Sequence, residues 1–366
     1  MAEINRPVFK KPDQEDFFHR LRAEVQDKVL RDPRPQNRNI VKCVFLLLAY
    51  FAAYSGILVF GNATPMLFAF YILTGIFMMV LFINSYHDAV HASLFRQRWL
   101  NRRFTLILEL FGSNSWLWQR RHLQLHHPFP NVPNWDIDIK QSKLVRIFPD
   151  SPMFELHRYQ HIYMWMIYPF YSLNWLYIRD FRDFFSNDDN YVKRMGKIPK
   201  IEFVKLFMAK IINLLFLVGI PLLVLQQPWH IIILGWLSMH VAASVFGVVA
   251  LISTHVDEHA QFPSVAPDGK MDNTWAGHQL LVTKDFSTGS PLANFLFGGF
   301  THHVAHHLFP GVAHTYYPEI TALIRKYADD YGFSYRSYPF HEAIISHFKL
   351  LKERGRHQSI FQSTEL

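Results

Sequence analysis

Hydrophobic residues gather in four long stretches of the chain, which cover residues 40–60, 66–84, 203–225 and 229–252. Each stretch is close to the ~20 apolar residues that an α-helix needs to cross the hydrocarbon core of a bilayer. Short uncharged segments, residues 61–65 and 226–228, separate the first two stretches and the last two. The pattern predicts an all-α membrane protein whose four transmembrane helices form two hairpins.

The polar remainder of the chain is expected on one side of the membrane. Two hairpins return the chain to its starting side, so the N-terminus, residues 85–202 and the residues after 252 share that side. The turns carry no charge, and the positive-inside rule therefore places the basic segments in the cytoplasm. We expect a helical cap there, in which residues 104–118 and 163–177 form short, aromatic-rich helices at the membrane interface.

Two polar segments, residues 1–39 and 350–366, flank the expected membrane domain of residues 40–349. Apolar residues near Phe17 and Leu21 follow a rough helical period and predict an amphipathic helix, which lies either on the membrane or on the body of the protein. The segment before residue 40 lacks the apolar core of a cleavable signal peptide. We therefore expect the first span to direct insertion, into a bacterial inner membrane or the endoplasmic reticulum, and the C-terminal tail to be loose.

Composition supports a membrane protein with basic surfaces. Half of the 366 residues are hydrophobic (50%), and the net charge at neutral pH is +8. Such a charge suits either nucleic acid or an anionic membrane surface, and the apolar stretches favour the membrane. The single cysteine, Cys43, excludes both an intrachain disulfide and a thiolate metal site.

Eight histidines recur in three clusters and His255, just after the fourth stretch, is a ninth, all on the expected cytoplasmic side. Several pairs are spaced i, i+4, and the last cluster has the i, i+3, i+4 spacing that places three imidazoles on one face of a helix. A zinc site uses about four ligands, so nine imidazoles suit two six-coordinate ions that share the set. The predicted ligands of this di-metal site are His87, His91, His122, His126, His127, His255, His303, His306 and His307.

Iron is the favoured metal for this site. Imidazole binds iron, copper, nickel and zinc, and a site that faces apolar substrate favours iron and oxygen chemistry. Zinc, as in a membrane protease or other hydrolase, is the alternative, but Asp88 follows His87 and the H-E-x-x-H signature is absent. A metal-binding membrane protein or transporter is a further alternative. It would require ligands at mid-bilayer, where His240 is the one histidine well inside a span.

Carboxylates near the clusters are expected to support the ligands. Asp88, Asp136 and Asp257 are placed to accept the outer N–H of a ligating imidazole and so to fix its tautomer. Asp138 and Glu258 are interpreted instead as solvated acids.

Three further histidines are ranked below these nine. His259 and His278 are rivals of His255 as ligands. His302 would point about 100° away from His303 on a helix and is left out of the set.

The clusters resemble the three histidine boxes of the membrane fatty acid desaturase superfamily. The matching motifs are H87-D-A-V-H91, H122-L-Q-L-H126-H127 and H303-V-A-H306-H307-L-F-P. Three C-terminal segments, residues 255–263, 275–280 and 298–310, are similar to the acyl-CoA and acyl-lipid desaturases related to linoleoyl-CoA desaturase. The likeness covers most of the chain.

The resemblance implies a non-haem di-iron centre that uses O₂ and two electrons to remove two hydrogens from a fatty acyl chain. Breaking an unactivated C–H bond needs an oxidant that no side chain supplies, which is consistent with a metal. The substrate would be an acyl-CoA or an acyl-lipid, held so that two adjacent methylenes face the iron. Nucleic acid is not an expected partner.

Two departures from the family pattern leave the double-bond position open. Desaturases that act near the carboxyl end often have Gln where this chain has His303, and Glu where it has Ala305. A hydroxylase on the same metal centre is the alternative reaction, because the sequence His255-x-x-Glu258-His259 is faintly similar to alkane hydroxylases.

Electrons are expected from a separate donor. The His-Pro-Gly-Gly motif of the family's fused haem domain does not occur in the chain, so a ferredoxin or a cytochrome is the expected partner. A group of arginines can dock such an acidic protein or a CoA or phospholipid phosphate, or can simply reflect the positive-inside rule. They are Arg96, Arg98, Arg102, Arg103, Arg120 and Arg121.

Overall fold

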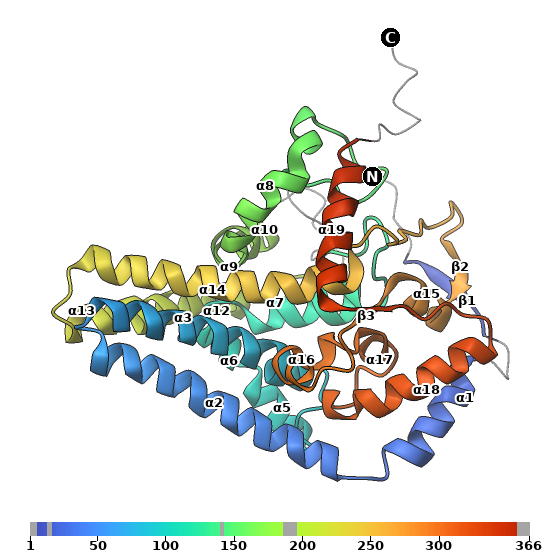
Figure 1. The fold of residues 1–366 in the computed structure, drawn as a ribbon, viewed down its shortest axis with the longest axis horizontal. Coiled ribbons are helices and arrows are strands. Elements are labelled where there is room, and N and C mark those ends of the chain that lie inside the picture. Colours follow the sequence, from blue (N-terminus) through green and yellow to red (C-terminus); the bar gives the residue numbers. More distant parts are fainter. Residues whose placement is uncertain (1–5, 13–16, 140–142, 186–195, 357–366) are drawn as a thin grey trace.

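Four long apolar helices dominate the computed structural model (Figure 1), which describes residues 6–12, 17–139, 143–185 and 196–356. Each is long and apolar enough to cross a membrane, as the sequence predicted. Two of them contain a π-helical turn. The first long helix is α2 (Arg34–Phe60) and the fourth is α14 (Trp229–His255). The second consists of α3 (Thr64–Leu81), η2 (Phe82–Tyr86) and α4 (His87–Val90). The third consists of α12 (Lys200–Leu214), η7 (Leu215–Gly219) and α13 (Ile220–Val224).

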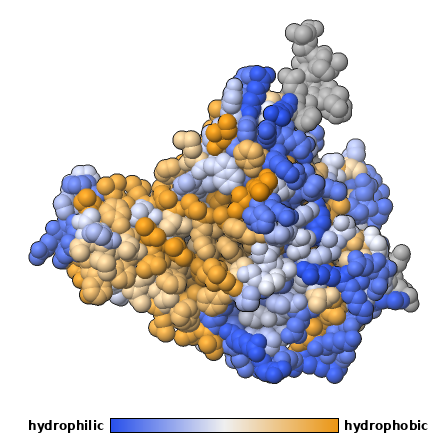
Figure 2. Space-filling model, viewed as in Figure 1, coloured by the Kyte–Doolittle hydropathy of each residue, from blue (hydrophilic) through white to orange (hydrophobic). Residues whose placement is uncertain are grey.

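The second long helix is the centre of this bundle, since α3 packs against both α2 and α14. Gly75 allows the close approach of α14, because a Cβ there would lie 2.2 Å from the main-chain oxygen of Met239. Small residues serve the same purpose in membrane helix pairs generally. Figure 2 shows that hydrophobic residues cover this half of the molecule and that hydrophilic residues cover much of the other.

Two helices continue beyond the predicted spans at their polar ends. The second span ends at residue 84 and its helix runs on through α4 to Val90, and the fourth span ends at residue 252 and its helix runs to His255. Hydropathy marks where the bilayer ends and not where the helix ends. Both extensions carry predicted ligands, His87 and His255, out of the apolar region.

The two predicted interface helices are each broken into short pieces. Gly112 has φ +89 and its neighbour Asn114 caps the next helix by accepting from the N–H of Leu117, so the helix predicted over 104–118 is interrupted there. The pieces between the long helices are α5 (Arg98–Phe104), α6 (Ile107–Leu110), α7 (Ser115–Arg120), η3 (Arg121–His126), η4 (Glu155–Tyr159), α8 (Gln160–Ile167), η5 (Tyr168–Phe170), α9 (Tyr171–Asn174), η6 (Trp175–Arg179) and α10 (Asp180–Phe185).

The C-terminal part adds helices and three short strands, one of which pairs with a strand near the N-terminus; the sequence did not predict these two small parallel strand pairs. Strands β1 (Val8–Lys10) and β2 (Lys270–Thr274) form one pair, and β3 (Asp285–Phe286) and β4 (Ser337–Tyr338) the other. Strands this short give no periodic signal. The remaining elements are α15 (Trp275–Val282), α16 (Pro291–Phe297), η8 (Gly298–Phe300), α17 (His303–Leu308), η9 (His314–Tyr316), α18 (Tyr317–Asp330) and α19 (Phe340–Arg354).

The N-terminal amphipathic helix is present and packs on the protein body. It comprises α1 (Phe17–Glu24) and η1 (Val25–Val29), and its apolar residues, such as Leu21, are buried in one cluster with Ile320 and Ile324 of α18. The apolar face of this helix therefore packs on the body of the protein, which is one of the two positions that the sequence left open.

The C-terminal segment is more structured at its start than the sequence suggested. Leu350 and Leu351 belong to α19 and are fully buried, so the polar tail begins after Arg354 and not at residue 350. Residues 357–366 of the predicted loose tail lie outside the described residues.

Candidate metal centre

The ligand nitrogens of nine histidines converge in two groups, and within each group they all lie within 4.8 Å of one another. These are the nine histidines selected from the sequence. The five-histidine group consists of His87, His91, His122, His127 and His306, and the four-histidine group of His126, His255, His303 and His307.

The Nε2 atoms in both groups are about evenly spaced. In the five-histidine group, Nε2 of His122 lies 3.0 Å from Nε2 of His87, 3.1 Å from that of His91 and 3.0 Å from that of His127. In the four-histidine group, Nε2 of His303 lies 2.8 Å from Nε2 of His255 and 3.1 Å from that of His307.

Helix geometry determines which histidine joins which group. The sequence predicted that the third cluster presents one shared face, and α17 divides that face between the groups. His303 and His307, four residues apart, lie together, while His306 reaches the other group, with its Nε2 3.0 Å from Nε2 of His127. The third cluster therefore bridges the two groups.

A π-helical turn performs the same division in the second cluster. In η3 the N–H of His127 donates to the carbonyl oxygen of His122, five residues earlier, at 2.9 Å. The wider turn aligns these two residues and turns His126 toward the four-histidine group. Single π-helical turns often occur at functional sites for this reason.

This spacing fits metal ions better than hydrogen bonds between imidazoles. A metal–nitrogen bond of about 2.1 Å places two ligands that meet at right angles about 3.0 Å apart. A neutral imidazole has one N–H and can donate one such bond. Nε2 of His122 is close to three other Nε2 atoms at once, which one N–H cannot satisfy and one shared ion can.

Burial keeps the imidazoles in the neutral form that binds metal. It lowers the pKa of His91 to about 3. Burial and neighbouring imidazoles together hold the pKa of five more histidines well below 6.5; they are His122, His127, His303, His306 and His307.

Three imidazoles of the four-histidine group have a partner on their outer nitrogen. Nδ1 of His126 lies 3.0 Å from Oδ1 of Asp136, Nδ1 of His307 lies 2.9 Å from Oε1 of Gln279, and Nδ1 of His255 lies 3.3 Å from the oxygen of Val282. Donation from Nδ1 leaves the Nε2 lone pair for a metal. Burial lowers the pKa of His126, but the charge of Asp136 and its hydrogen bond outweigh that effect and raise it.

Of these partners, the sequence indicated Asp136 and missed Gln279. Gln279 lies in residues 275–280, where its neighbour His278 was considered as a ligand instead. A polar residue next to a histidine in a mostly apolar helix was the signal that could have identified it.

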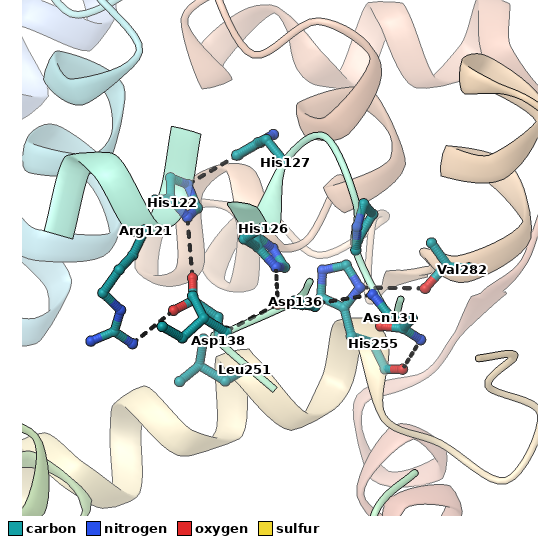
Figure 3. A network of polar contacts seen from close by, with 12 residues as sticks. Arg121, His122, His126, His127, Asn131, Asp136, Asp138, Leu251, His255 and Val282 are labelled. Carbon is teal, nitrogen blue, oxygen red and sulfur yellow. Dashed lines mark hydrogen bonds and ion pairs between the residues drawn. The ribbon is translucent and has the colours of Figure 1, made fainter. Parts of the chain in front are cut away.

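The five-histidine group is less completely held. Nδ1 of His122 lies 3.6 Å from Oδ2 of Asp138 (Figure 3). Nδ1 of His306 lies 3.3 Å from the hydroxyl of Tyr317. Asp138 was interpreted as a solvated acid, but it pairs with Arg121 at 3.0 Å and with Arg179 at 3.2 Å. Two buried guanidinium groups thus hold the carboxylate beside His122.

Four of the residues ranked as supporting or second-rank ligands lie elsewhere. Asp88 accepts from Nδ1 of His314 at 2.8 Å, and Asp257 forms an ion pair with Lys284. The side chain of His259 is 60% exposed. His278 lies with its Nε2 2.9 Å from the oxygen of Pro130. Neither histidine belongs to either group.

A cavity of about 210 Å³ adjoins the two groups. Its walls include His126, His255 and His303 of the four-histidine group and His122 of the other. Met79 and Leu251, from two of the long apolar helices, line it as well. The cavity thus joins the imidazoles to the apolar half of the molecule.

Comparison with known proteins agrees with this arrangement. The family model described as fatty acid desaturase matches residues 63–339, which include all three histidine clusters and most of the chain. The chain belongs to the fatty acid desaturase family and is an oxidoreductase of the desaturase type.

Three relatives of the chain are all named desaturases, and the names of the first two specify a lipid-bound acyl chain. The chain is 29% identical over 362 residues to acyl-lipid (8-3)-desaturase of Physcomitrium patens, with 94% of this chain and 72% of that protein covered. It is 27% identical over 323 residues to sn-1 linoleoyl-lipid 6-desaturase of Synechocystis, with 86% and 88% covered. It is 25% identical over 371 residues to probable Delta(5) fatty acid desaturase C of Dictyostelium discoideum, with 94% and 77% covered.

Proposed function

We propose that the protein is an O₂-dependent acyl-lipid desaturase whose nine clustered imidazoles hold two iron ions. The observation that carries this proposal is the position of two groups of buried imidazole nitrogens beside an apolar cavity. Bound iron would supply, with O₂ and two electrons, an oxidant strong enough to remove hydrogen from an unactivated methylene. The names of the relatives support a lipid-bound acyl chain over an acyl-CoA.

The polypeptide's own part is to position the acyl chain and exclude water. Met79 and Leu251 offer apolar walls along which a hydrocarbon chain can lie, while His122, His126 and His303 border the same space. Two adjacent methylenes held there would face the imidazole groups in a fixed orientation, which favours one double-bond position. Exclusion of water also protects a strong oxidant from side reactions.

The proposed topology places the metal centre on the cytoplasmic side. The turns that join the long helices in pairs, residues 61–63 and 225–228, carry no charge, whereas the opposite end of the molecule is rich in basic residues. Two membrane hairpins would then carry a helical cap on the inner face of a bacterial inner membrane or of the endoplasmic reticulum. We propose that the catalytic domain, expected over residues 40–349, extends to the end of α19 at Arg354.

Lipid analysis of a host that expresses the protein tests the reaction. We expect a new double bond in membrane acyl chains, with iron in the purified protein. A new alcohol in place of the double bond would instead identify a hydroxylase, and zinc without O₂ consumption would contradict the proposal.

His306→Ala tests the site within the same assay. The variant should lose iron and product while it still inserts into the membrane, because His306 is the residue through which α17 reaches the five-histidine group, with its Nε2 3.0 Å from Nε2 of His127. His302→Ala is the matched control: His302 is also buried, but its Nδ1 lies 2.9 Å from the hydroxyl of Thr321, outside both groups. Wild-type turnover by His306→Ala would count against the site.

A further inference from the structure

The metal centre comes closest to the molecular surface at one histidine. His91 is partly exposed, whereas the other eight clustered histidines are buried. Its Nε2 lies 3.1 Å from Nε2 of His122, within the five-histidine group. His91 is therefore the clustered residue nearest to solvent by burial, and the one at which an electron from outside can enter the centre.

The segment after His91 is held rigidly against the metal centre. Leu94 is fully buried in a cluster with Cys43 and Ala89. The side chain of Asn101 accepts from the N–H of Phe95 at 3.0 Å and donates to its carbonyl oxygen at 2.7 Å. Because α5 also packs against α4, which begins at His87, its surface has a fixed position relative to the five-histidine group.

This rigid segment presents a strongly basic surface, which we term the α5 basic patch. The patch consists of Arg96, Arg98, Arg102 and Arg103. These four arginines are exposed and make no hydrogen bond or ion pair with any residue that the structure describes. Trp99, which lies between Arg98 and Arg102 in the sequence, is 63% exposed.

The α5 basic patch does not serve the substrate cavity. The cavity is lined by residues of α3, α8, α9 and α14 and of the segments near them, and no residue of α5 contributes to its walls. A headgroup or CoA phosphate of a bound substrate would therefore meet other residues. Of the cationic side chains named as docking candidates in the sequence, Arg121 is buried in an ion pair with Asp183 and is not available at the surface.

We propose that the α5 basic patch is the docking site of an acidic, one-electron redox protein, which delivers electrons through His91. The inference rests on the proposed function. Desaturation of one CH₂–CH₂ unit with one O₂ consumes two electrons and two protons and yields one double bond and two waters, so two docking events supply one turnover. Opposite charge speeds such encounters by about 10- to 1,000-fold at low salt, and Trp and Arg are the residue types that dominate protein interfaces.

Electron transfer in nanodiscs of neutral lipid tests the proposal. The variant Arg96→Gln/Arg98→Gln/Arg102→Gln/Arg103→Gln is compared with a matched control that removes four exposed charges elsewhere, Lys10→Gln/Lys11→Gln/Lys197→Gln/Lys200→Gln. The probes are a reduced acidic ferredoxin and, separately, dithionite with a small mediator. We expect the patch variant to accept electrons from ferredoxin at least about 10-fold more slowly at low salt, and to react normally with dithionite.

Several results would overturn the docking proposal. Equal ferredoxin rates for the patch variant and the control would do so. An equal loss of rate with dithionite would also do so. A defect that appears only when anionic lipid is present would assign the arginines to lipid headgroups instead. Direct binding of the same ferredoxin to the nanodisc-embedded protein separates this proposal from the proposed function. Patch-dependent binding without any desaturation would retain the docking site and reject the reaction.

Discussion

The two histidine groups differ in how firmly the protein holds them. In the four-histidine group, three outer nitrogens meet Asp136, Gln279 and the carbonyl oxygen of Val282 within 3.3 Å. In the five-histidine group, His306 meets a hydroxyl at 3.3 Å and His122 meets Asp138 at 3.6 Å. One buried Nδ1 in each group, that of His127 and that of His303, has no hydrogen-bond partner among the described residues.

The groups also face different surroundings. The four-histidine group contributes His126, His255 and His303 to the walls of the cavity, whereas the five-histidine group contributes His122. The five-histidine group in turn includes His91, the one clustered histidine that is only partly buried as a residue. This contrast suggests that the firmly held group faces the acyl chain, while the other receives electrons. Fewer imidazoles at the cavity would also leave more of an ion's coordination free for O₂.

Removal of a ligand should have the largest effect and should separate the groups. His303→Ala leaves three imidazoles in its group, and we expect loss of that metal and product below detection. His91→Ala leaves four, the number that the other group has naturally, so it should retain more iron. Iron per chain, by mass spectrometry of the metal, and lipid product measure both. More iron in His303→Ala than in His91→Ala would contradict the contrast.

Acid should destabilise the metal-free protein strongly. Unfolded imidazoles take up protons near pH 6.5, but burial lowers the pKa of His91 to about 3 in the folded chain, and those of five other histidines also lie well below 6.5. The unfolded chain therefore binds more protons below pH 6.5. Stability is fully present above that pH and falls as the pH drops toward 3, by about 1.4 kcal/mol per group and pH unit.

Thermal unfolding of metal-free protein in detergent between pH 8 and pH 4 checks this direction. His126 has the opposite effect on stability, because Asp136 raises the pKa of His126 despite burial. The histidines whose pKa is lowered outnumber it. Metal-loaded protein should resist acid further, until protons displace the metal. Stability that rises on acidification would contradict neutral, buried imidazoles.

Loss of an outer partner should have an intermediate effect. Asp136→Asn weakens the support of His126, and we expect metal affinity to fall by about 10- to 100-fold. Asp257→Asn is the control, because Asp257 is equally buried but pairs with Lys284 and has no hydrogen bond to the nine histidines within the part of the chain that the structure describes. It should lower thermal stability and leave metal affinity nearly unchanged. A chelator competition assay distinguishes the two, and equal losses of affinity would remove the special role of Asp136.

The smallest effect is expected at Tyr317. Its hydroxyl lies 3.3 Å from Nδ1 of His306, at the long end of hydrogen-bond distances. Tyr317→Phe should therefore cost about 1 kcal/mol or less of metal binding, which is at most about a 5-fold loss. Gln279→Leu, which removes a 2.9 Å contact to His307, should cost more in the same assay. The reverse order would show that the four-histidine group is not the more firmly held.

Much of this arrangement was predictable because its signals are local. Stretches of about 20 apolar residues predict membrane-length helices. Histidines at helical spacing predicted eight of the nine clustered imidazoles, and the ninth, His255, was predicted from its position at the end of the fourth stretch. The division into two groups was not predictable, since it depends on the π-helical turn before His127, which has no signal in hydropathy. Gln279 was likewise missed because it meets His307 only through the packing of α15 against α17.

Mössbauer spectroscopy of protein purified from cells grown on isotopically enriched iron tests the central claim most directly. Five imidazoles and four imidazoles are different ligand sets, so we predict two iron signals of equal intensity and two iron ions per chain. A single iron signal with one ion per chain, or a fully metallated protein that contains only zinc, would contradict it.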